Sequence, residues 1–444
     1  MDYAPHTEED LEAMLAVVGR SSLDELFAHI PPGLRPKGEP NLPHGLSEDE
    51  TLRAMTRYAE ANATAAVCFA GGGAYDHYVP AMVGAIISRG ELLTSYTPYQ
   101  PEVSQGMLQA LFEYQTVISE LTGLPVSNAS LYDGGSAVAE AVSMACAGTR
   151  RNAVLLSTAL DEPSRTVVRT YGHPLGRTIT AVEYGADGRT PVTAVGEDIA
   201  AVIIQQPNAL GIVEDVRAHA DAAHAAGAQL IVKLEPTSVG LLATPGSQGA
   251  DLVVGEGQAL GQGLTYGGPT FGFLACRTDH VRRIPGRIVG QTVDGEGRRG
   301  YVMTLRAREQ DIRRERATSN ICTNQTLCAV AALIYLSWLG PQGLAELATT
   351  CLARAKAAAA RLSEIDGVEL AVAGHFIKEF PLRLSVKDPH AAVESLHDAG
   401  FLVGPVVPDG VAAGAVMVAL TERRSASEVE ALADALARVV KEQS

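Results

Sequence analysis

The chain has 444 residues, 46% of them hydrophobic, which is enough for a large core and two or three domains. Its formal net charge of -16 argues against nucleic acid or an anionic membrane as the main partner, because phosphate binding needs clustered Lys and Arg. The six cysteines form no CxxC pair, the N-terminus has no apolar signal region, and no run reaches the roughly 18 apolar residues of a membrane span. These features predict a cytoplasmic protein without disulfides.

Residues 1–65 are predicted to form an N-terminal helical arm. The segments 7–10 and 47–50 have the Ser/Thr-x-x-acid pattern that caps the start of a helix. Between them, the proline-containing segments 30–33 and 39–43 exclude regular structure. We expect this arm to pack on a neighbouring chain.

Two loops rich in polar side chains precede the first long predicted helix. Residues 71–78 join a glycine triplet to Tyr75, Asp76 and His77, and can act either as active-site lining or as a hinge. Residues 95–102 contain two prolines, which favour an extended backbone. This second loop carries two phenols, an amide and a carboxylate on Tyr96, Tyr99, Gln100 and Glu102.

Strands and helices alternate over the middle of the chain. Helices are predicted over 107–121 with Gly123 as the stop, from Asp133, and over 214–226 and 326–339. The apolar runs that predict buried strands lie at 153–156, 201–204, 230–234, 251–254 and 271–276. Because several of these strands are continuously apolar, we expect a large, mainly parallel sheet of the seven-stranded type, covered by helices on both faces. This α/β domain is assigned to residues 66–330.

Residues 331–444 predict a smaller C-terminal α+β domain. Its predicted elements are an Ala-rich helix, a strand and two further helices, at 343–362, 380–385, 390–399 and 427–441. Just before this domain, ten arginines fall between Arg282 and Arg316. In a chain this acidic, we interpret that segment as facing an anion or a protein interface.

The order of elements is similar to that of fold type I pyridoxal-phosphate enzymes, the aspartate-aminotransferase-like class. In that plan, a Gly/Ser-rich turn at a helix start holds the phosphate with free backbone N–H groups, which residues 133–136 can provide. An acid after a mid-sheet strand holds the pyridinium, and Glu235 occupies that place. A lysine after the next strand forms the Schiff base, but Gly257 and Gln258 stand there instead.

No lysine occurs between residues 234 and 355, so only Lys233 could supply an amine near this site. Lys233 belongs to the strand itself, two residues before Glu235, and we expect it to take no such part. The turn at 133–136 also has a simpler interpretation, as a tight strand-to-helix connection. The pattern therefore predicts a cofactor-binding scaffold without its covalent anchor.

Six ordered segments carry a more specific resemblance: AGGGAYDHYVPAMV (70–83), TSYTPYQPEVSQG (94–106), LYDGGSAVAEA (131–141), GADLVVGEGQALG (249–261), GGPTFGF (267–273) and RRERATSNICTNQ (313–325). Together they resemble the glycine decarboxylase P-protein family over nearly the whole chain. Within it, the chain is similar to the shorter alpha subunit, subunit 1, of the two-chain bacterial glycine dehydrogenase (decarboxylating). One departure is Arg316, where a lysine is expected before Ala-Thr-Ser-Asn, although the charge is kept.

The resemblance implies an oxidoreductase of amino-acid catabolism, acting in the glycine cleavage system. The P-protein decarboxylates glycine through pyridoxal phosphate and passes the aminomethyl group to the lipoyl arm of H-protein. In two-chain systems the Schiff-base lysine belongs to the beta subunit. The resemblance therefore implies an α2β2 heterotetramer, with pyridoxal phosphate bound covalently to the partner beta subunit and no Schiff-base lysine in this chain.

By motif position, the resemblance also implies which residues complete the beta-subunit site. Hydroxyls and amides can orient a carboxylate or a phosphate without bringing a competing amine. Four residues would face the substrate or the lipoyl channel, and two would lie near the phosphate of the partner's cofactor: Tyr96, Tyr99, Gln100 and Glu102 in the first group, Asn320 and Thr323 in the second. The simpler interpretations are a rigid loop with ordinary surface tyrosines and, for 318–323, a helix N-cap before Thr326.

Two other functions stay open at this point. A self-sufficient pyridoxal-phosphate lyase, desulfurase-like and using Lys233, would bind the cofactor on the isolated chain; a non-catalytic scaffold or regulatory subunit would bind only protein. No metal site is predicted, because His219 and His224 are five residues apart on one helix and do not share a face; we expect both to be exposed. We regard residues 133–136 and Glu235 as relics of a second site, and expect it to be empty.

Overall fold

The computed structural model describes residues 5–38, 41–62, 66–265 and 267–444. Contacts divide the chain into two compact units, Met1–Thr64 and Ala65–Ser444. The predicted irregular segment at 39–43 and the predicted boundary at residue 65 fall partly outside the described residues.

The N-terminal unit contains α1 (Glu8–Val17), α2 (Leu23–Leu26) and α3 (Glu48–Glu60). Both predicted capping boxes are confirmed, at Thr7 with Asp10 and at Ser47 with Glu50, where side chain and backbone satisfy each other reciprocally. In α3, Leu52, Met55 and Tyr58 are exposed. Helices α1 and α3 therefore owe their start points to local hydrogen bonds.

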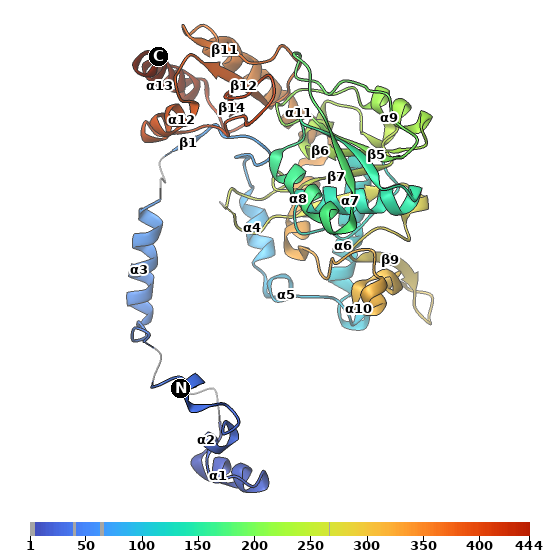
Figure 1. Ribbon diagram of the computed structural model, residues 1–444, viewed down its shortest axis with the longest axis vertical. Coiled ribbons are helices and arrows are strands. Elements are labelled where there is room, and N and C mark those ends of the chain that lie inside the picture. The colour runs from blue at the N-terminus through green and yellow to red at the C-terminus, as the bar shows by residue number, and fades with distance from the viewer. Residues whose placement is uncertain (1–4, 39–40, 63–65, 266) are drawn as a thin grey trace. The chain divides into compact units, whose positions relative to one another are not determined.

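A seven-stranded sheet forms the centre of the second unit (Figure 1). The strand order is β2-β8-β7-β6-β5-β3-β4, with parallel pairing from β4 through β7, while β8 runs antiparallel to β7 and β2. The strands are β2 (Val126–Ser127), β3 (Ala153–Ser157), β4 (Thr178–Val182), β5 (Ile199–Gln206), β6 (Gln229–Leu234), β7 (Leu252–Glu256) and β8 (Gly272–Cys276). The predicted mainly parallel sheet is confirmed. Strand β4 gave no signal in the sequence because it is a half-exposed edge strand without an apolar run.

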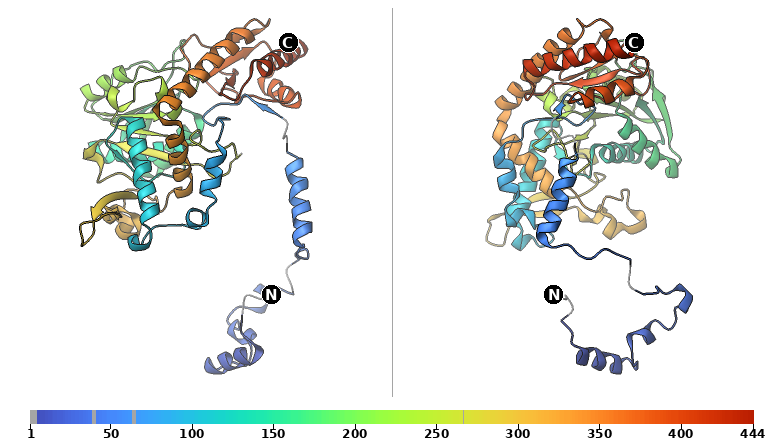
Figure 2. Two further views of the ribbon diagram at one scale, coloured as in Figure 1. Left: turned by 180° about the vertical axis from the view of Figure 1, so that it is seen from behind. Right: turned by 90° about the vertical axis from the view of Figure 1, so that its left-hand side faces the viewer.

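Helices cover both faces of this sheet, as the continuously apolar strands predict. Successive residues of a strand point to opposite faces, so Val202 and Ile204 pack with α6 (Gln105–Thr122), α9 (Val216–Ala225) and the start of α11 (Thr326–Leu362). Ala201 and Ile203 pack with α7 (Gly134–Thr149) and α8 (Glu162–Gly172) on the other face. Figure 2 shows α6 and α11 side by side.

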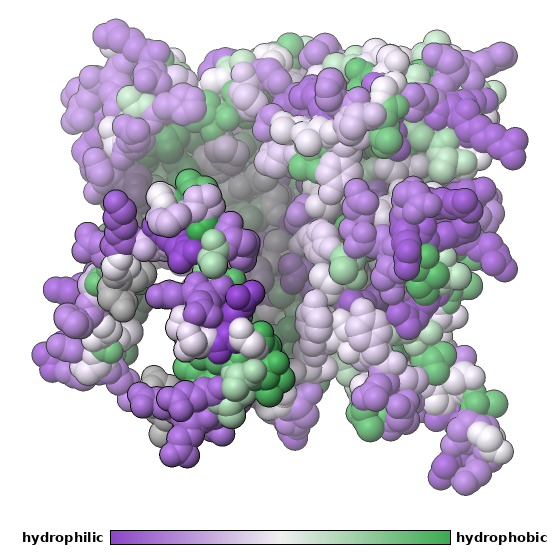
Figure 3. Space-filling view, turned by 60° about the horizontal axis from the view of Figure 1, so that its bottom comes forward, coloured by the Kyte–Doolittle hydropathy of each residue, from purple (hydrophilic) through white to green (hydrophobic). Residues whose placement is uncertain are grey.

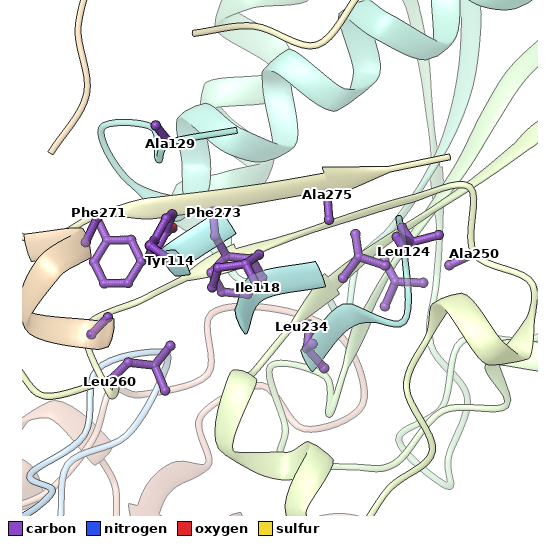
Figure 4. Close-up of a cluster of buried hydrophobic side chains, with 14 of the residues drawn as sticks. Tyr114, Ile118, Leu124, Ala129, Leu234, Ala250, Leu260, Phe271, Phe273 and Ala275 are labelled. Carbon is purple, nitrogen blue, oxygen red and sulfur yellow. The ribbon is translucent and has the colours of Figure 1, made fainter. Parts of the chain in front are cut away.

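The larger core is built around aromatic side chains near β8. Figure 4 shows Tyr114 and Ile118 of α6 pointing toward Phe271 and Phe273. The Tyr114 and Phe271 rings meet edge to face at 5.8 Å, and all four residues are at most 1% exposed. Burial of each such side chain contributes about 1.5–3 kcal/mol. Helix α6 ends where predicted, at Gly123, whose φ of 71° suits glycine.

Helix α11 (Thr326–Leu362) runs from the large core into a second, smaller one. Its backbone leaves the helical conformation at Gly340 (φ 62°), the residue at which the sequence predicts an end. It is long and apolar enough to span a membrane by composition, but its apolar side chains pack in the two cores. The second core lies under an antiparallel sheet in the order β11-β12-β14, and its elements are β11 (Val368–Leu370), β12 (Glu379–Leu384), β14 (Val416–Ala419), α12 (Pro389–Asp398) and α13 (Ala426–Gln443).

Several shorter elements complete the second unit. Strand β1 (Val67–Cys68) pairs in parallel with β13 (Phe401–Leu402), and α4 (Ala81–Ile87) and α5 (Gly90–Leu93) precede the 95–102 loop. The arginine-rich segment contains a hairpin of β9 (Ile288–Val293) and β10 (Arg299–Thr304), then η7 (Arg306–Arg308) and α10 (Gln310–Arg313). On the face in Figure 3, hydrophilic residues predominate and hydrophobic residues form separate groups.

Candidate functional site

A cavity of about 510 Å³ lies at the carboxyl ends of the central strands, where α/β sheets bind ligands. The glycine triplet, the starts of α7 and α8, and the segment after β7 all contribute to it. The charged or amide side chains in its lining are Asp133, Asp161, Lys233, Glu256 and Gln258.

The start of α7 already holds carboxylates from this chain. Asp133 is the N-cap, and its side chain accepts the Ser136 N–H at 2.7 Å. Glu256 accepts the Gly134 N–H at 3.0 Å, and the Thr270 hydroxyl donates to the other Glu256 oxygen. Burial raises the pKa of Glu256, while these hydrogen bonds oppose the rise. Two of the backbone donors that a phosphate would use, the N–H groups of Gly134 and Ser136, are therefore occupied by the protein's own carboxyl groups.

Glu235, in the predicted place of the pyridinium partner, is neutralised by a lysine of this chain. The Nζ atom of Lys378 lies 2.9 Å from Glu235 Oε1, and the Thr237 hydroxyl donates to the same carboxylate at 2.9 Å. Burial by itself would raise the pKa of Glu235, but the charge and hydrogen bond of Lys378, together with His77 and the Thr237 hydroxyl, outweigh burial and lower it. Lys378 also lies 2.9 Å from His77 Nε2. The carboxylate is thus committed to an internal ion pair.

Lys233, the only candidate for a Schiff base in the middle of the chain, is also committed. Its Nζ atom forms an ion pair with Asp161 and donates to the Ser164 hydroxyl at 3.0 Å. Burial alone would raise the pKa of Asp161, but the Lys233 charge and hydrogen bond lower it. An ammonium group held by an ionised carboxylate is a poor nucleophile.

The place predicted for the lysine offers no room for one. A side chain at Gly257 would overlap the ring of Phe271. Gln258 points into a buried contact, where it accepts the Tyr75 N–H at 2.8 Å and donates to the Tyr75 carbonyl at 3.1 Å. The strands and helices around this cavity are arranged as in a pyridoxal-phosphate site. The side chains that line it, however, do not fit the cofactor.

The glycine-triplet loop, predicted as active-site lining or a hinge, is held by buried hydrogen bonds. Glu379 accepts from the Tyr75 hydroxyl at 2.6 Å and from the Gly72 N–H at 2.8 Å. His77 Nδ1 lies 2.7 Å from Glu422 Oε2. Because these partners all come from the C-terminal sheet and its flanks, the loop joins the two sheets.

The expectation that both histidines of α9 are exposed is wrong for His219. It is 3% exposed, and its Nε2 atom lies 3.2 Å from the Thr190 carbonyl. His219 lies on the face of α9 that buries Val216 and Ala223, a face the five-residue spacing did not reveal. His224 is exposed, as predicted, and its Nε2 atom lies 2.8 Å from Asp251 Oδ2.

The residues predicted to serve a partner chain lie at the surface. Tyr96 is 74% exposed and Tyr99 is 52% exposed, and Gln100 and Glu102 are exposed beside them. Asn320 is exposed and Thr323 is half-buried. A tyrosine this open at the surface of one chain is available to another.

The structure brings Tyr99 and Thr323 together through Arg287. Arg287 Nη1 donates to the Thr323 hydroxyl oxygen and to Asn324 Oδ1, each at 2.8 Å, and Nη2 donates to the Cys322 carbonyl at 3.2 Å. Its guanidinium carbon lies 5.8 Å from the centroid of the Tyr99 ring. Arg287 was not singled out in the sequence, although it belongs to the arginine-rich segment interpreted as facing an anion.

The backbone around Thr323 is fixed by a second contact. The hydroxyl oxygen of Tyr132 accepts the N–H groups of Cys322 at 3.0 Å and Thr323 at 3.3 Å. Tyr132 directly precedes Asp133, so the internal cavity and the surface loop share one short segment.

Comparison with known sequences gives matches to one family over nearly the whole chain. A sequence profile of the glycine cleavage system P-protein matches residues 1–436. The chain is 47% identical to the probable glycine dehydrogenase (decarboxylating) subunit 1 of Geotalea daltonii, over 98% of this chain and 99% of the relative. It is 48% identical to the protein of the same name from Citrifermentans bemidjiense, over 98% of each.

Comparison with solved structures supports the same family and fold. A crystal structure of glycine decarboxylase (P-protein) of the glycine cleavage system, in inhibitor-bound form, superimposes with a TM-score of 0.92 at 45% identity, covering 99% of this chain and 100% of that one. A sphingosine-1-phosphate lyase of Burkholderia pseudomallei gives a TM-score of 0.66 at 14% identity, covering 92% of this chain and 93% of that one. The second likeness shows the fold alone, and the predicted fold type I architecture is confirmed.

Proposed function

Because the chain belongs to the glycine cleavage system P-protein family, as a subunit 1 of glycine dehydrogenase (decarboxylating), we propose that it acts by completing the active site of a lysine-bearing beta subunit. One observation carries this proposal: the chain's own cavity is satisfied internally. Glu256 fills the start of α7, and Lys233 and Glu235 are both held in ion pairs. The polar groups that are free to act on a ligand lie instead on the exposed loops at Tyr99 and Thr323.

The partner would carry the covalent chemistry. The name subunit 1, borne by the relatives, implies a second subunit. We propose an α2β2 heterotetramer in the cytoplasm, with glycine and lipoylated H-protein as substrates and pyridoxal phosphate bound covalently to the beta subunit. When bound there, the cofactor would supply the electron sink needed for the decarboxylation of glycine.

The 95–102 loop would face the substrate or the lipoyl channel. Tyr96, Tyr99, Gln100 and Glu102 all present polar groups at the surface. The two hydroxyls and the amide can donate to a carboxylate, and the Glu102 carboxylate can accept from an amino group. None of these groups is an amine, so none would compete with glycine for the partner's cofactor.

Thr323 is suited to donate a hydrogen bond outward. Its hydroxyl oxygen accepts from Arg287 Nη1 at 2.8 Å, which leaves the hydroxyl proton free for an external acceptor. The exposed amide of Asn320 lies three residues earlier in the same loop. We propose that both residues lie near the phosphate of the partner's cofactor.

The first experiment tests which chain carries the cofactor. This chain is purified alone and together with its beta subunit, treated with borohydride to trap pyridoxal phosphate, and assayed for exchange of the glycine carboxyl group with bicarbonate. We expect trapping on the beta subunit only, and exchange only when both chains are present. Cofactor trapped on Lys233 of the isolated chain would instead establish the self-sufficient lyase. Full exchange by the beta subunit alone would also overturn the proposal.

A second experiment separates an active-site role from a scaffold. Glu102→Gln and Tyr99→Phe are compared with Glu120→Gln, which changes an exposed carboxylate on α6 outside both loops. We expect at least one loop variant to lower the exchange rate about 10-fold or more, in the range typical of a lost polar contact in a transition state. A non-catalytic scaffold predicts unchanged exchange in all three variants.

A further inference from the structure

Arg287 is a buried guanidinium that forms no ion pair with any carboxylate of the described residues. It is 3% exposed, and its hydrogen-bond partners are a hydroxyl, an amide oxygen and a backbone carbonyl, all of them neutral. Its Nε atom has no hydrogen-bond partner. Removing a charge from water without a counter-ion costs several kcal/mol. Such a charge is therefore expected to serve an anion that comes from outside the chain.

Other incompletely bonded groups surround the same place. The Tyr99 ring lies between two arginines, with guanidinium carbons 5.8 Å away for Arg287 and 5.1 Å away for Arg306. The Arg306 Nε atom and the Thr97 hydroxyl also lack partners. Two carboxylates lie near these arginines: Asp311 forms an ion pair with Arg306 at 3.3 Å, and Glu309 interacts electrostatically with Arg308, Arg306 and Arg287. Arg306 is thus paired, whereas Arg287 has no ion-pair partner among the described residues.

The hydrogen bonds of Arg287 connect this charge to the two surface loops. Three of its contacts fix residues 322–324, and the fourth is the face of the Tyr99 ring. A planar guanidinium can make such contacts simultaneously, whereas a lysine ammonium cannot reproduce the fork. Arg287 therefore sets the positions of the two surface loops relative to each other.

We propose that Arg287 is a positioning residue for the partner subunit's active site: it aligns the Thr323 hydroxyl with the Tyr99 ring and adds the positive charge toward which a phosphate monoester docks. This inference rests on the proposed function, in which the two loops complete the beta-subunit site. The ligand class is the phosphate group of the cofactor that the partner holds. Arg287 acts on it through Thr323 and through its field.

The test uses complexes of the full chain with its beta subunit. Arg287→Lys keeps the buried charge but loses the fork, and it is compared with Thr323→Val, with the double variant, and with Arg151→Gln. Arg151 is a matched control because it donates hydrogen bonds to the backbone carbonyls of Ile199 and Ala226, which lie outside the loops at Tyr99 and Thr323. The measured quantities are the dissociation constant of pyridoxal phosphate, from its absorbance band, and kcat and KM for carboxyl exchange.

We expect Arg287→Lys to weaken cofactor binding by about 10-fold or more, while KM for glycine changes less. The double variant should bind the cofactor no more weakly than Thr323→Val, because the two changes remove one linked interaction. Arg151→Gln should lower only the melting temperature. Wild-type cofactor affinity in Arg287→Lys, or effects that multiply in the double variant, would overturn the inference.

Failure of the inference and failure of the proposed function give different results. If Thr323→Val and Tyr99→Phe both retain full exchange and cofactor affinity, the loops do not serve the partner's site and the proposed function itself fails. If those variants are impaired while Arg287→Lys is not, only the role of Arg287 is wrong. If Arg287→Lys does not assemble with its partner, Arg306→Lys provides the second test, because Arg306 lies against the same Tyr99 ring. We expect this variant to weaken cofactor binding at least 3-fold. Unchanged binding would contradict a role for these two arginines.

Discussion

The Nζ atom of Lys378 lies 2.9 Å from Oε1 of Glu235, and the two side chains are 4% and 11% exposed. Glu235 follows β6 of the large sheet, and Lys378 directly precedes β12 of the C-terminal sheet. One buried ion pair thus links the two sheets and, at the same time, occupies the acid that a cofactor ring would need.

Replacement of this lysine should destabilise the protein strongly. In Lys378→Met, the Glu235 carboxylate would stay buried without its counter-ion, which costs about 3–5 kcal/mol. Urea denaturation of the isolated chain measures this loss. Glu369→Gln, which removes an exposed carboxylate 3.9 Å from Arg383, should cost less than about 1 kcal/mol. Equal losses in the two variants would show that the buried pair has no special role.

A second buried pair should behave as a coupled unit. Lys233→Met leaves Asp161 buried and ionised, so we expect a loss of about 3–5 kcal/mol. Adding Asp161→Asn to the same chain should recover a large part of that loss, because the uncompensated charge is then gone. The double-mutant cycle is followed by denaturant unfolding. Additive effects would mean that Lys233 and Asp161 do not neutralise each other.

Glu140 should make the stability depend on pH. Burial raises its pKa from 4.5 to about 7, against the opposing effects of Ser319 and Arg177. The folded state therefore binds more protons than the unfolded state between these values, so the free energy of unfolding falls as the pH rises from 4.5 through 7, by on the order of 3 kcal/mol for this group.

The comparison of Glu140→Gln with wild type isolates this group from other titrations. We expect the variant to match wild type near pH 5 and to be more stable at pH 8, by up to about 3 kcal/mol. Glu120→Gln, on the exposed side of α6, should show no such difference. Parallel curves for Glu140→Gln and wild type would show that Glu140 titrates normally.

Gly257 should not tolerate a side chain. An added Cβ would overlap the Phe271 ring in a fully buried part of the core, and such overpacking costs about 1–3 kcal/mol or more. Gly263 is the matched control because no heavy atom lies within 4 Å of the position of its Cβ. We therefore expect a lower melting temperature for Gly257→Ala and an unchanged or slightly higher one for Gly263→Ala. Similar melting temperatures would mean that Phe271 moves aside.

Much of the fold follows from local patterns. The capping boxes at Thr7 and Ser47, the stop of α6 at Gly123 and the break in α11 at Gly340 depend on neighbouring residues only, and each is where the sequence predicts it. Edge strand β4 and the β9–β10 hairpin were missed because their residues are half-exposed and carry no apolar run. Their pairing is decided by neighbours distant in sequence.

The sequence by itself determined that positions 257 and 258 are glycine and glutamine rather than lysine, because the identity of a residue does not depend on the fold. It also predicts loops around Tyr99 and Thr323, and their role in a partner's site is our proposal. Only the tertiary structure decided that Lys378 neutralises Glu235 from 143 residues away and that Glu256 binds the start of α7 from 122 residues away. It likewise joined Tyr99 to Thr323 through Arg287. The physical reason is that ion pairs and hydrogen bonds depend on distances of a few ångströms, which the folded chain sets and the order of residues does not.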